Sequence, residues 1–271
     1  NSFIGIEYRG VSTLWKPKRS MGFELLESQN LDNERSLSIF DFSVNSKWIL
    51  DAMYVDRAKA RNRTSLELWQ SLPSNIEHIG TNCEYVEVFL NYESLGLFSL
   101  CESLTYESLS LNVQSILITG KHNSKSTYFR KLPDNSPTGP YWHNWEQKIP
   151  DSDFGNDWDA FEKLAKLIVK KSDQEFIAEI GNQIDLDNLI DYYLFINMCK
   201  AYDDIAKNWF FLKKSDNEKF VIVPWDLDAS WGRKWTGSSE GYGKEEGTNG
   251  IVTNGLYERL ISLNPDNIKE N

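Results

Sequence analysis

Three oxygen-bearing side chains in the last third of the chain have the types and spacing that phosphate chemistry needs. Asp203 and Asn208 lie five positions apart, and Asp226 follows a further run of apolar residues. Carboxylate and amide oxygens are the hard ligands that Mg²⁺ prefers, and a free carboxylate can take a proton from an attacking hydroxyl. The spacing of Asp203 and Asn208 is a weak signal by itself, so its weight depends on whether folding brings the three side chains together.

A predicted β-hairpin brings two of these side chains together. Two β-prone runs flank a polar Ser-Asp-Asn-Glu turn at residues 215–218. If the residues that border the turn face each other, counting outward along both arms places Asn208 opposite Trp225 and therefore beside Asp226. Asp203 lies just before the open end of this hairpin, on a loop that leaves a helix, so it can reach the same cavity.

Asp228 is a second candidate metal ligand beside Asp226. Residues two apart in an extended segment share one face, so the two carboxylates could bind one cation together. For isolated aspartates, a turn cap or a solvated surface pair is the more common explanation. Glycoside hydrolysis is a poor alternative, because glycosidases normally place two carboxyl groups on separate elements, roughly 5 to 9.5 Å apart. It also leaves Asn208 unexplained.

The second half of the chain predicts the helices that must carry the Asp203 loop. Apolar residues recur at helical spacing between Phe161 and Ile168, which indicates one helix. A second helix, over residues 187–199, leads directly into the loop. Residues 105–155 are interrupted by prolines and are expected to be less regular.

The first third of the chain predicts strands. Strands are expected at residues 4–8, 21–25, 37–42, 85–90 and 95–100. One helix is expected at residues 57–69, after the capping residue Asp56. A strand-rich first part and a helix-rich second part indicate an α+β protein in two lobes, residues 1–104 and 105–271. Because the first residues already alternate as a strand does, we expect the chain to be excised from a longer protein.

The composition argues against several classes of function. The net charge of −11 and the pI near 4.9 disfavour nucleic acid or an anionic membrane as the main partner, since both attract clustered Lys and Arg. No stretch approaches the ~20 consecutive apolar residues of a membrane span. Cys83, Cys101 and Cys199 are too few and too scattered for a disulfide scaffold or a zinc site.

Five stretches of the chain carry a recognisable set of motifs. They are Arg-Gly-Val-Ser-Thr at 9–13, Pro-Lys-Arg-Ser at 17–20, a W-x-L-x-A, D-R and R-N series at 48–62, an E-V-F-L-N hairpin at 87–102, and 203–232 with D-x4-N and W-D-x-D-x-x-x-G. This set resembles the spore-coat protein H (CotH) kinase family of atypical, secreted or surface-associated kinase-like proteins. Tyr92 and Ser94 depart from the family's hairpin, which is expected to alter only the turn.

The resemblance implies a bilobal, protein-kinase-like fold and an ATP-dependent transfer of phosphate to Ser or Thr hydroxyls. Asp203 would then be the catalytic base, and Asn208, Asp226 and Asp228 would hold Mg²⁺ or Mn²⁺. The residues before Asp203 leave the choice between Asp203 and Asp204 open, although the spacing to Asn208 favours Asp203. The expected substrate is a basic, Ser-rich protein of the spore coat or cell surface, or a secreted protein.

Four further residues are expected to bind the nucleotide. Arg9 and Lys18 belong to the first two predicted strands, where positive charge can offset that of a triphosphate, and ordinary surface charge is an equal alternative. Ser12 lies in a turn that can offer donors to phosphate, although turns favour such residues anyway. Glu102 ends the hairpin where the hinge of a kinase would begin, so it is expected near the adenosine.

A non-catalytic surface adhesin or coat-assembly module is the alternative function. Ten tryptophans motivate it, because exposed aromatic side chains can anchor a protein or sugar partner. The expected location, outside the cytoplasm, is the same for both functions.

Overall fold

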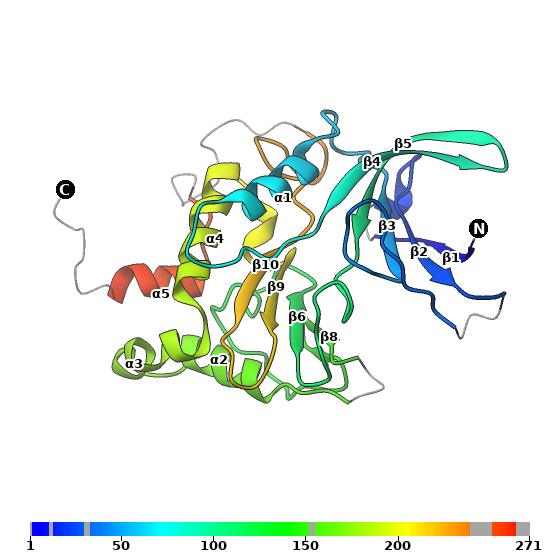
Figure 1. Ribbon diagram of the computed structural model, residues 1–271. Coiled ribbons are helices and arrows are strands. Elements are labelled where there is room, and N and C mark those ends of the chain that lie inside the picture. The colour runs from blue at the N-terminus through cyan, green and yellow to red at the C-terminus, as the bar shows by residue number, and fades with distance from the viewer. Residues whose placement is uncertain (1, 11–12, 30–32, 152–154, 239–250, 264–271) are drawn as a thin grey trace.

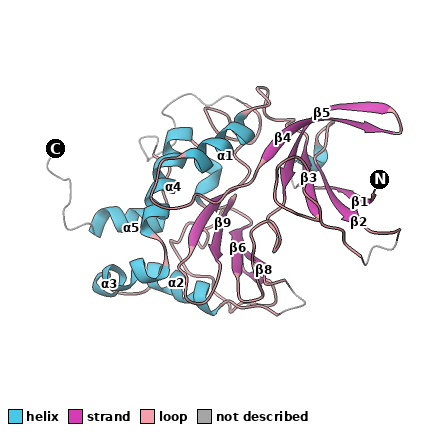
Figure 2. Cartoon of the chain, in the orientation of Figure 1, coloured by secondary structure: helices cyan, strands magenta, loops and turns pink. Residues whose placement is uncertain are grey.

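Most of the described strands lie in the first half of the chain, and most of the described helices in the second. The computed structural model describes residues 2–10, 13–29, 33–151, 155–238 and 251–263. The strands are β1 (Phe3–Tyr8), β2 (Met21–Leu26), β3 (Lys47–Asp51), β4 (Cys83–Leu90), β5 (Glu93–Glu102), β6 (Ile116–Gly120), β7 (Tyr141–Trp142), β8 (Trp145–Ile149), β9 (Trp209–Lys213) and β10 (Val221–Pro224). The helices are α1 (Arg61–Ser71), α2 (Asp159–Val169), α3 (Asp173–Gln183), α4 (Leu186–Cys199) and α5 (Gly255–Leu263), with short 3-10 turns η1 (Thr13–Trp15) and η2 (Tyr202–Ile205). The predicted α+β class is confirmed (Figure 2).

The first five strands form one antiparallel sheet in the order β1-β2-β3-β5-β4 (Figure 1). Its central strand β3 buries Trp48, Ile49 and Leu50 in succession, so it lacks the alternating pattern of a half-exposed strand. The strand expected at residues 37–42 is wrong. That segment bends and packs Leu37, Ile39 and Phe42 against the sheet, where the ring of Phe42 stacks on Trp48, whereas Phe40 is exposed.

The second sheet is also antiparallel, with strand order β10-β9-β6-β8-β7. Residues 105–155 were expected to be irregular, and this expectation is wrong for β6 and β8. Strand β6 is buried at every position, so its sequence lacks the alternating pattern that predicts a strand. Helices cover this sheet: Tyr192 of α4 stacks on Trp209 of β9, with ring centroids 5.6 Å apart. Phe161 of α2 packs on Phe211 of the same strand.

The hairpin that carries the candidate metal ligands has the predicted register. Pro224 of β10 pairs with Trp209 of β9, and the Trp225 N–H donates to the Asn208 carbonyl at 2.9 Å. Asn208 and Trp225 therefore face each other, as counting from the turn predicts. The buried ammonium of Lys213 donates to three carbonyls of the turn, which fixes the closed end of the hairpin.

Both helices predicted in the second half are confirmed as α2 and α4. The Asp185 carboxylate caps α4 by accepting from the Asn188 N–H. Helix α1 begins at Arg61, four residues later than predicted, because Asp56 accepts from the N–H groups of Ala60 and Arg61 across a turn rather than as the adjacent cap. Helices α3 and α5 were not predicted from the sequence, although α3 opens with a capping box.

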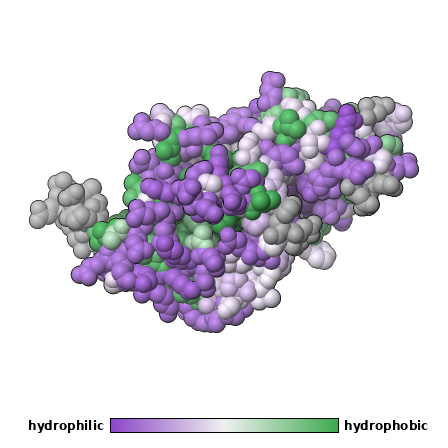
Figure 3. Space-filling model, turned by 60° about the horizontal axis from the view of Figure 1, so that its bottom comes forward, coloured by the Kyte–Doolittle hydropathy of each residue, from purple (hydrophilic) through white to green (hydrophobic). Residues whose placement is uncertain are grey.

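None of the described helices is long and apolar enough to cross a membrane. The face shown in Figure 3 is mostly hydrophilic, and its hydrophobic side chains lie in small separate groups.

A disulfide joins Cys83 of β4 to Cys101 of β5. The two residues lie directly opposite each other in the antiparallel register, with their Cα atoms 4.2 Å apart. The sequence analysis did not foresee this bond, because 18 residues separate the cysteines and only the strand register makes them neighbours. Cys199, the third cysteine, is free and buried.

Reduction of this disulfide should lower the free energy of unfolding by about 3 kcal/mol, because the bond closes a loop of intermediate length in the unfolded chain. Urea unfolding with and without dithiothreitol measures the loss. The Cys83→Ala/Cys101→Ala protein should match the reduced wild type and should not respond to dithiothreitol. An unchanged wild-type midpoint after verified reduction would contradict the prediction.

Candidate active site

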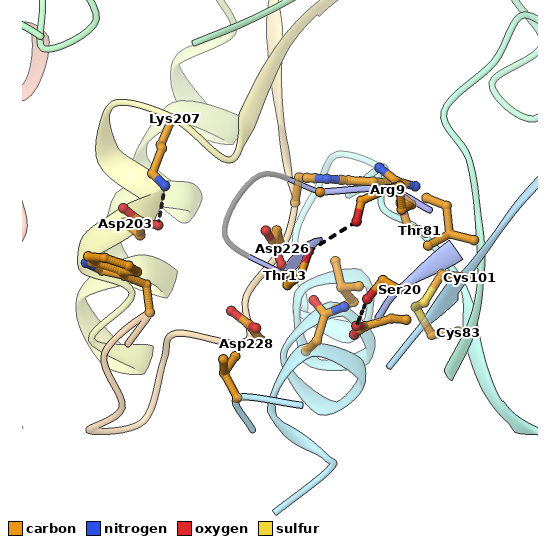
Figure 4. Close-up of a pocket in the computed structure, with 18 of the residues that line it drawn as sticks. Arg9, Thr13, Ser20, Thr81, Cys83, Cys101, Asp203, Lys207, Asp226 and Asp228 are labelled. Carbon is orange, nitrogen blue, oxygen red and sulfur yellow. Dashed lines mark hydrogen bonds and ion pairs between the residues drawn. A yellow bond between two sulfur atoms is a disulfide. The ribbon is translucent and has the colours of Figure 1, made fainter. Parts of the chain in front are cut away.

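A cavity of about 450 Å³ lies between the first sheet and the second half of the chain. Figure 4 shows Asp203, Asp226 and Asp228 on one side of it and Arg9 on the other. Elements far apart in sequence therefore line one space: the β1–β2 turn, the end of β3, helix α1, and the segments that follow α4 and β10. Asn208 lines an adjoining groove, which shares Arg9 and other wall residues with the cavity.

Asp203 has three side-chain partners at the cavity wall. Its carboxylate accepts from the Lys207 ammonium at 2.7 Å and from the Asn208 amide at 3.3 Å. The amide of Asn123, from the segment after β6, is 3.4 Å away. Asp203 and Asn208 are thus in direct contact, and a cation stands beside the carboxylate that we expect to act as the base.

Close packing and uncommon backbone angles shape the segments that carry these residues. A Cβ on Gly120 of β6 would lie 2.2 Å from the Ala206 carbonyl oxygen, so the strand can approach the Asp203 loop this closely only with glycine. Asn208 and Asp226 have φ angles of 58° and 56°, in the left-handed region that non-glycine residues seldom adopt. Both backbones must be held by surrounding contacts.

The structure separates Asp203 from its neighbour Asp204. The Asp203 side chain lines the cavity, whereas Asp204 is 0% exposed and points into the protein. Among the described residues no group donates a hydrogen bond to the Asp204 carboxyl oxygens. Burial, together with the charge of Asp203, raises the pKa of Asp204 well above its usual value. Asp204 is therefore inaccessible, and of the two aspartates only Asp203 is placed to meet a substrate.

Carboxylates from distant segments crowd the cavity. Asp51 at the end of β3 joins Asp203, Asp226 and Asp228 in its wall. Asp226 is open to the cavity but enclosed by protein elsewhere, and this burial, with Asp51 and Asp203 as further causes, raises its pKa to about 6. Burial and then the charge of Asp226 raise the pKa of Asp228 well above its usual value. A cation near the pair would relieve both effects.

Arg9 is the main positive group on the first-sheet side. Its guanidinium lies 6.0 Å from the centre of the Trp225 ring, and it lines both the cavity and the groove. Burial lowers the pKa of Arg9, and the charges of Asp226 and Asp51 oppose that shift. Arg9 is thus a partly buried cation that faces the acidic cluster, as a phosphate-binding residue would.

The acidic groups do not form a complete metal site by themselves. Within the described residues, no group of three His, Cys, Asp or Glu side chains is arranged to hold a metal ion. Mg²⁺ commonly takes one or two carboxylates and fills its remaining positions with water and substrate phosphates. Asp226 and Asp228, the two carboxyl groups whose pKa values are raised, fit a site of that kind together with Asn208.

Lys18 and Glu102, two of the other expected nucleotide residues, do not line the cavity. Lys18 donates to the Leu97 carbonyl and rests over the Phe98 ring, and it does not line the cavity. Glu102 accepts from the N–H groups of Ser43 and Asn82 in a separate, smaller pocket. Ser12 lies outside the described residues. The structure therefore brings Arg9 to the acidic cluster but not Lys18 or Glu102.

Three residues of the cavity were missed by sequence reasoning. Lys207 directly precedes Asn208, and this adjacency was the only available signal for it. Asp51 lies inside the W-x-L-x-A motif, where it looks like an ordinary strand end. Asn62 belongs to the R-N motif of α1, and no function was assigned to this motif from the sequence. Its side chain lines the cavity.

The fold and the acidic cavity define an α+β protein with a candidate divalent-cation and phosphate site. The profile of the CotH kinase protein family matches residues 6–269, so this chain belongs to that family. Among curated proteins it is similar to the inner spore coat protein H of Bacillus subtilis (strain 168), with 24% identity over 236 residues. That match covers 85% of this chain and 59% of the relative, so the chain spans about three-fifths of the relative's length.

Asp228→Asn should stabilise the metal-free protein at pH 7 by roughly 0.5–2 kcal/mol, since it removes a half-buried carboxylate that repels its neighbours. The native pKa is raised, so the native state binds more protons than the unfolded state. Wild-type stability should therefore fall relative to the variant as the pH rises from 4 to 7. Thermal unfolding across this range measures the difference, and the exposed Asp41→Asn is the matched control. Equal midpoints for Asp228→Asn and wild type at pH 7 would contradict the prediction.

Proposed function

We propose that this chain is a protein kinase that uses ATP with Mg²⁺ or Mn²⁺ to phosphorylate Ser or Thr hydroxyls of another protein. The observation that carries the proposal is the meeting of Asp203, Lys207 and Asn208 with Asp226 and Asp228 around connected cavities. Membership in the CotH kinase family supports phosphate transfer as the reaction class.

Asp203 is the proposed base. It lines the cavity, and its ion pair with Lys207 orients the carboxylate for an approaching hydroxyl. It accepts the hydroxyl proton while the acceptor oxygen bonds to the terminal phosphorus and the bond to the ADP oxygen breaks. The nearby Lys207 ammonium stabilises negative charge on the transferred group.

Asn208, Asp226 and Asp228 are the proposed metal-holding residues. A divalent cation would supply charge neutralisation for the phosphates there. The acidic side chains would hold the cation at the cavity wall, and Arg9 would contact the phosphates from the opposite wall. Lys18, Ser12 and Glu102 remain proposed nucleotide contacts, although Lys18 and Glu102 would have to leave their present partners.

The two sheets suggest how a kinase-like arrangement would divide the chain. The first sheet would be the nucleotide-covering lobe, residues 1–104, and the remainder, residues 105–271, would be the catalytic lobe. The cavity that both parts line supports this division. The proposed acceptor is a basic, Ser-rich protein of a spore coat or cell surface, or a secreted protein, and the name of the spore coat relative supports that location.

A non-catalytic binding module is the second candidate function. Trp15, in the turn between β1 and β2, is 89% exposed, and Tyr92, at the tip of the β4–β5 hairpin, is fully exposed. Such aromatic side chains can anchor a partner without any chemistry. Thermal stabilisation by ATP and Mg²⁺ would favour the kinase, because only a ligand that binds the native state raises its melting temperature.

Asp203→Asn and Asp226→Asn should each lower phosphate transfer about 10² to 10⁴-fold, since one removes the base and the other a metal ligand. The assay combines the protein, labelled ATP, Mg²⁺ or Mn²⁺ and a basic Ser-rich peptide. Mass spectrometry of the peptide distinguishes an added phosphate from an added nucleotide. Asp41→Asn is the control, and its activity should equal that of wild type. No transfer by wild type, or equal transfer by Asp226→Asn, would overturn the kinase proposal.

Lys207→Met should lower kcat about 10²-fold with little change in KM for ATP, because its ammonium acts on charge that develops in the transition state. Steady-state kinetics at saturating metal measure both constants. Lys163→Met, on α2, is the matched control for loss of a surface lysine. A rise in KM with unchanged kcat would instead assign Lys207 to substrate binding.

A further inference from the structure

Helix α1 contacts the candidate metal-binding loop through three side chains. The Asn62 Oδ1 accepts from the Leu227 N–H at 2.9 Å, across 165 residues of sequence. One residue earlier, the Arg61 guanidinium donates to the Ser230 carbonyl at 3.1 Å. One turn further along, the Ser65 hydroxyl accepts from the Trp231 indole N–H at 2.9 Å. One face of α1 therefore holds the loop of residues 226–231 along its length.

The position of the Asn62 contact is informative. The Leu227 N–H belongs to the peptide bond that joins Asp226 to Leu227, so the contact orients the backbone between the two candidate ligands Asp226 and Asp228. Leu227 itself is fully buried, which leaves the two carboxylates on the cavity side. A change of this one hydrogen bond would rotate both carboxylates together.

The loop needs an external support. Asp226 has a φ of 56°, a conformation that costs an ordinary residue about 1–2 kcal/mol and that would relax if nothing held it. Asp226 also shares the cavity wall with Asp51, Asp203 and Asp228, so this loop carries a carboxylate into an acidic cluster. A neutral acceptor such as Asn62 can hold the backbone without adding another negative charge.

The start of α1 is itself fixed. The Asp56 carboxylate is 2% exposed, pairs with the Arg61 guanidinium, and accepts from backbone N–H groups at the helix start. The N-terminal turn that carries Asn62 is thus held in place before any ligand binds. The helix can serve as a rigid reference for the loop.

We propose that Asn62 is a positioning residue that holds Asp226 and Asp228 in the metal-binding orientation through the Leu227 N–H. This inference rests on the proposed function, because it assigns the metal-holding task to those aspartates. It gives the R-N motif of α1 a role: Arg61 and Asn62 couple the helix to the loop. Outer groups that orient metal ligands commonly change metal affinity 10–100-fold when they are removed.

The test compares binding of a non-hydrolysable ATP analogue with and without Mn²⁺, measured by calorimetry on the whole chain. Asn62→Ala should weaken binding of the Mn²⁺-loaded analogue 10–100-fold and leave binding of the metal-free analogue unchanged. Asn62→Asp keeps an acceptor oxygen for Leu227 and should retain at least the wild-type affinity. Thr64→Ala, an exposed change on the same helix, is the matched control and should behave as wild type.

Two additional measurements separate positioning from general stability and from direct ligation. Ser65 does not line the cavity, so Ser65→Ala cannot remove a ligand, yet it should weaken the Mn²⁺-loaded complex several-fold by freeing Trp231. In the transfer assay, Asn62→Ala should need 10–100-fold more Mg²⁺ for half-maximal rate and should regain most of its activity at saturating Mg²⁺. A purely structural role would lower the melting temperature without this metal dependence.

The outcomes distinguish this inference from the proposed function. If wild type binds the Mn²⁺-loaded analogue and Asn62→Ala binds it equally well, the positioning role is overturned and the kinase proposal stands. The same holds if Asn62→Ala weakens the metal-free and Mn²⁺-loaded complexes to the same extent. If wild type gains no affinity from Mn²⁺, the metal site of the proposed function fails, and the role of Asn62 fails with it.

Discussion

Repulsion among the carboxylates of one cavity is the constraint on which the rest of this structure depends. Asp51, Asp203, Asp226 and Asp228 come from segments that would separate freely in an unfolded chain, and folding brings their charges into a partly enclosed space. Such an arrangement opposes folding in the absence of a cation, because burial and like charges both disfavour ionised carboxylates. Extensive packing elsewhere must offset this cost.

The packing that offsets the repulsion lies on both sides of the cavity. On one side, the second sheet and its helices bury a large aromatic cluster that includes Trp209, Phe211 and Phe161. On the other, β3 is buried on both faces, and the Cys83–Cys101 disulfide ties β4 to β5. The segments that carry the acidic side chains are thus anchored to packed elements, and the site can keep its shape although its charges repel.

The two walls of the cavity carry different chemical groups. The segments after α4 and β10 supply the proposed base and oxygen ligands, whereas the first sheet supplies Arg9, and α1 supplies neutral hydrogen-bond acceptors. An anionic ligand that carries a divalent cation would complement both walls, because its metal would meet the carboxylates and its phosphates the arginine. The net charge of −11 describes the whole chain and does not reveal that Arg9 places a positive charge in the cavity.

The sequence by itself determined the features that depend on neighbours along the chain: the helices α2 and α4, the α+β class, and the β9–β10 register that sets Asn208 opposite Trp225. Local periodicity and turn chemistry are enough for these. Only the tertiary structure decided which of two adjacent aspartates, Asp203 or Asp204, reaches the cavity, because that depends on how the loop packs on β6. It also brought together Asn62 with Leu227 and Cys83 with Cys101, since contacts between distant segments are set by packing and strand register, which no local pattern records.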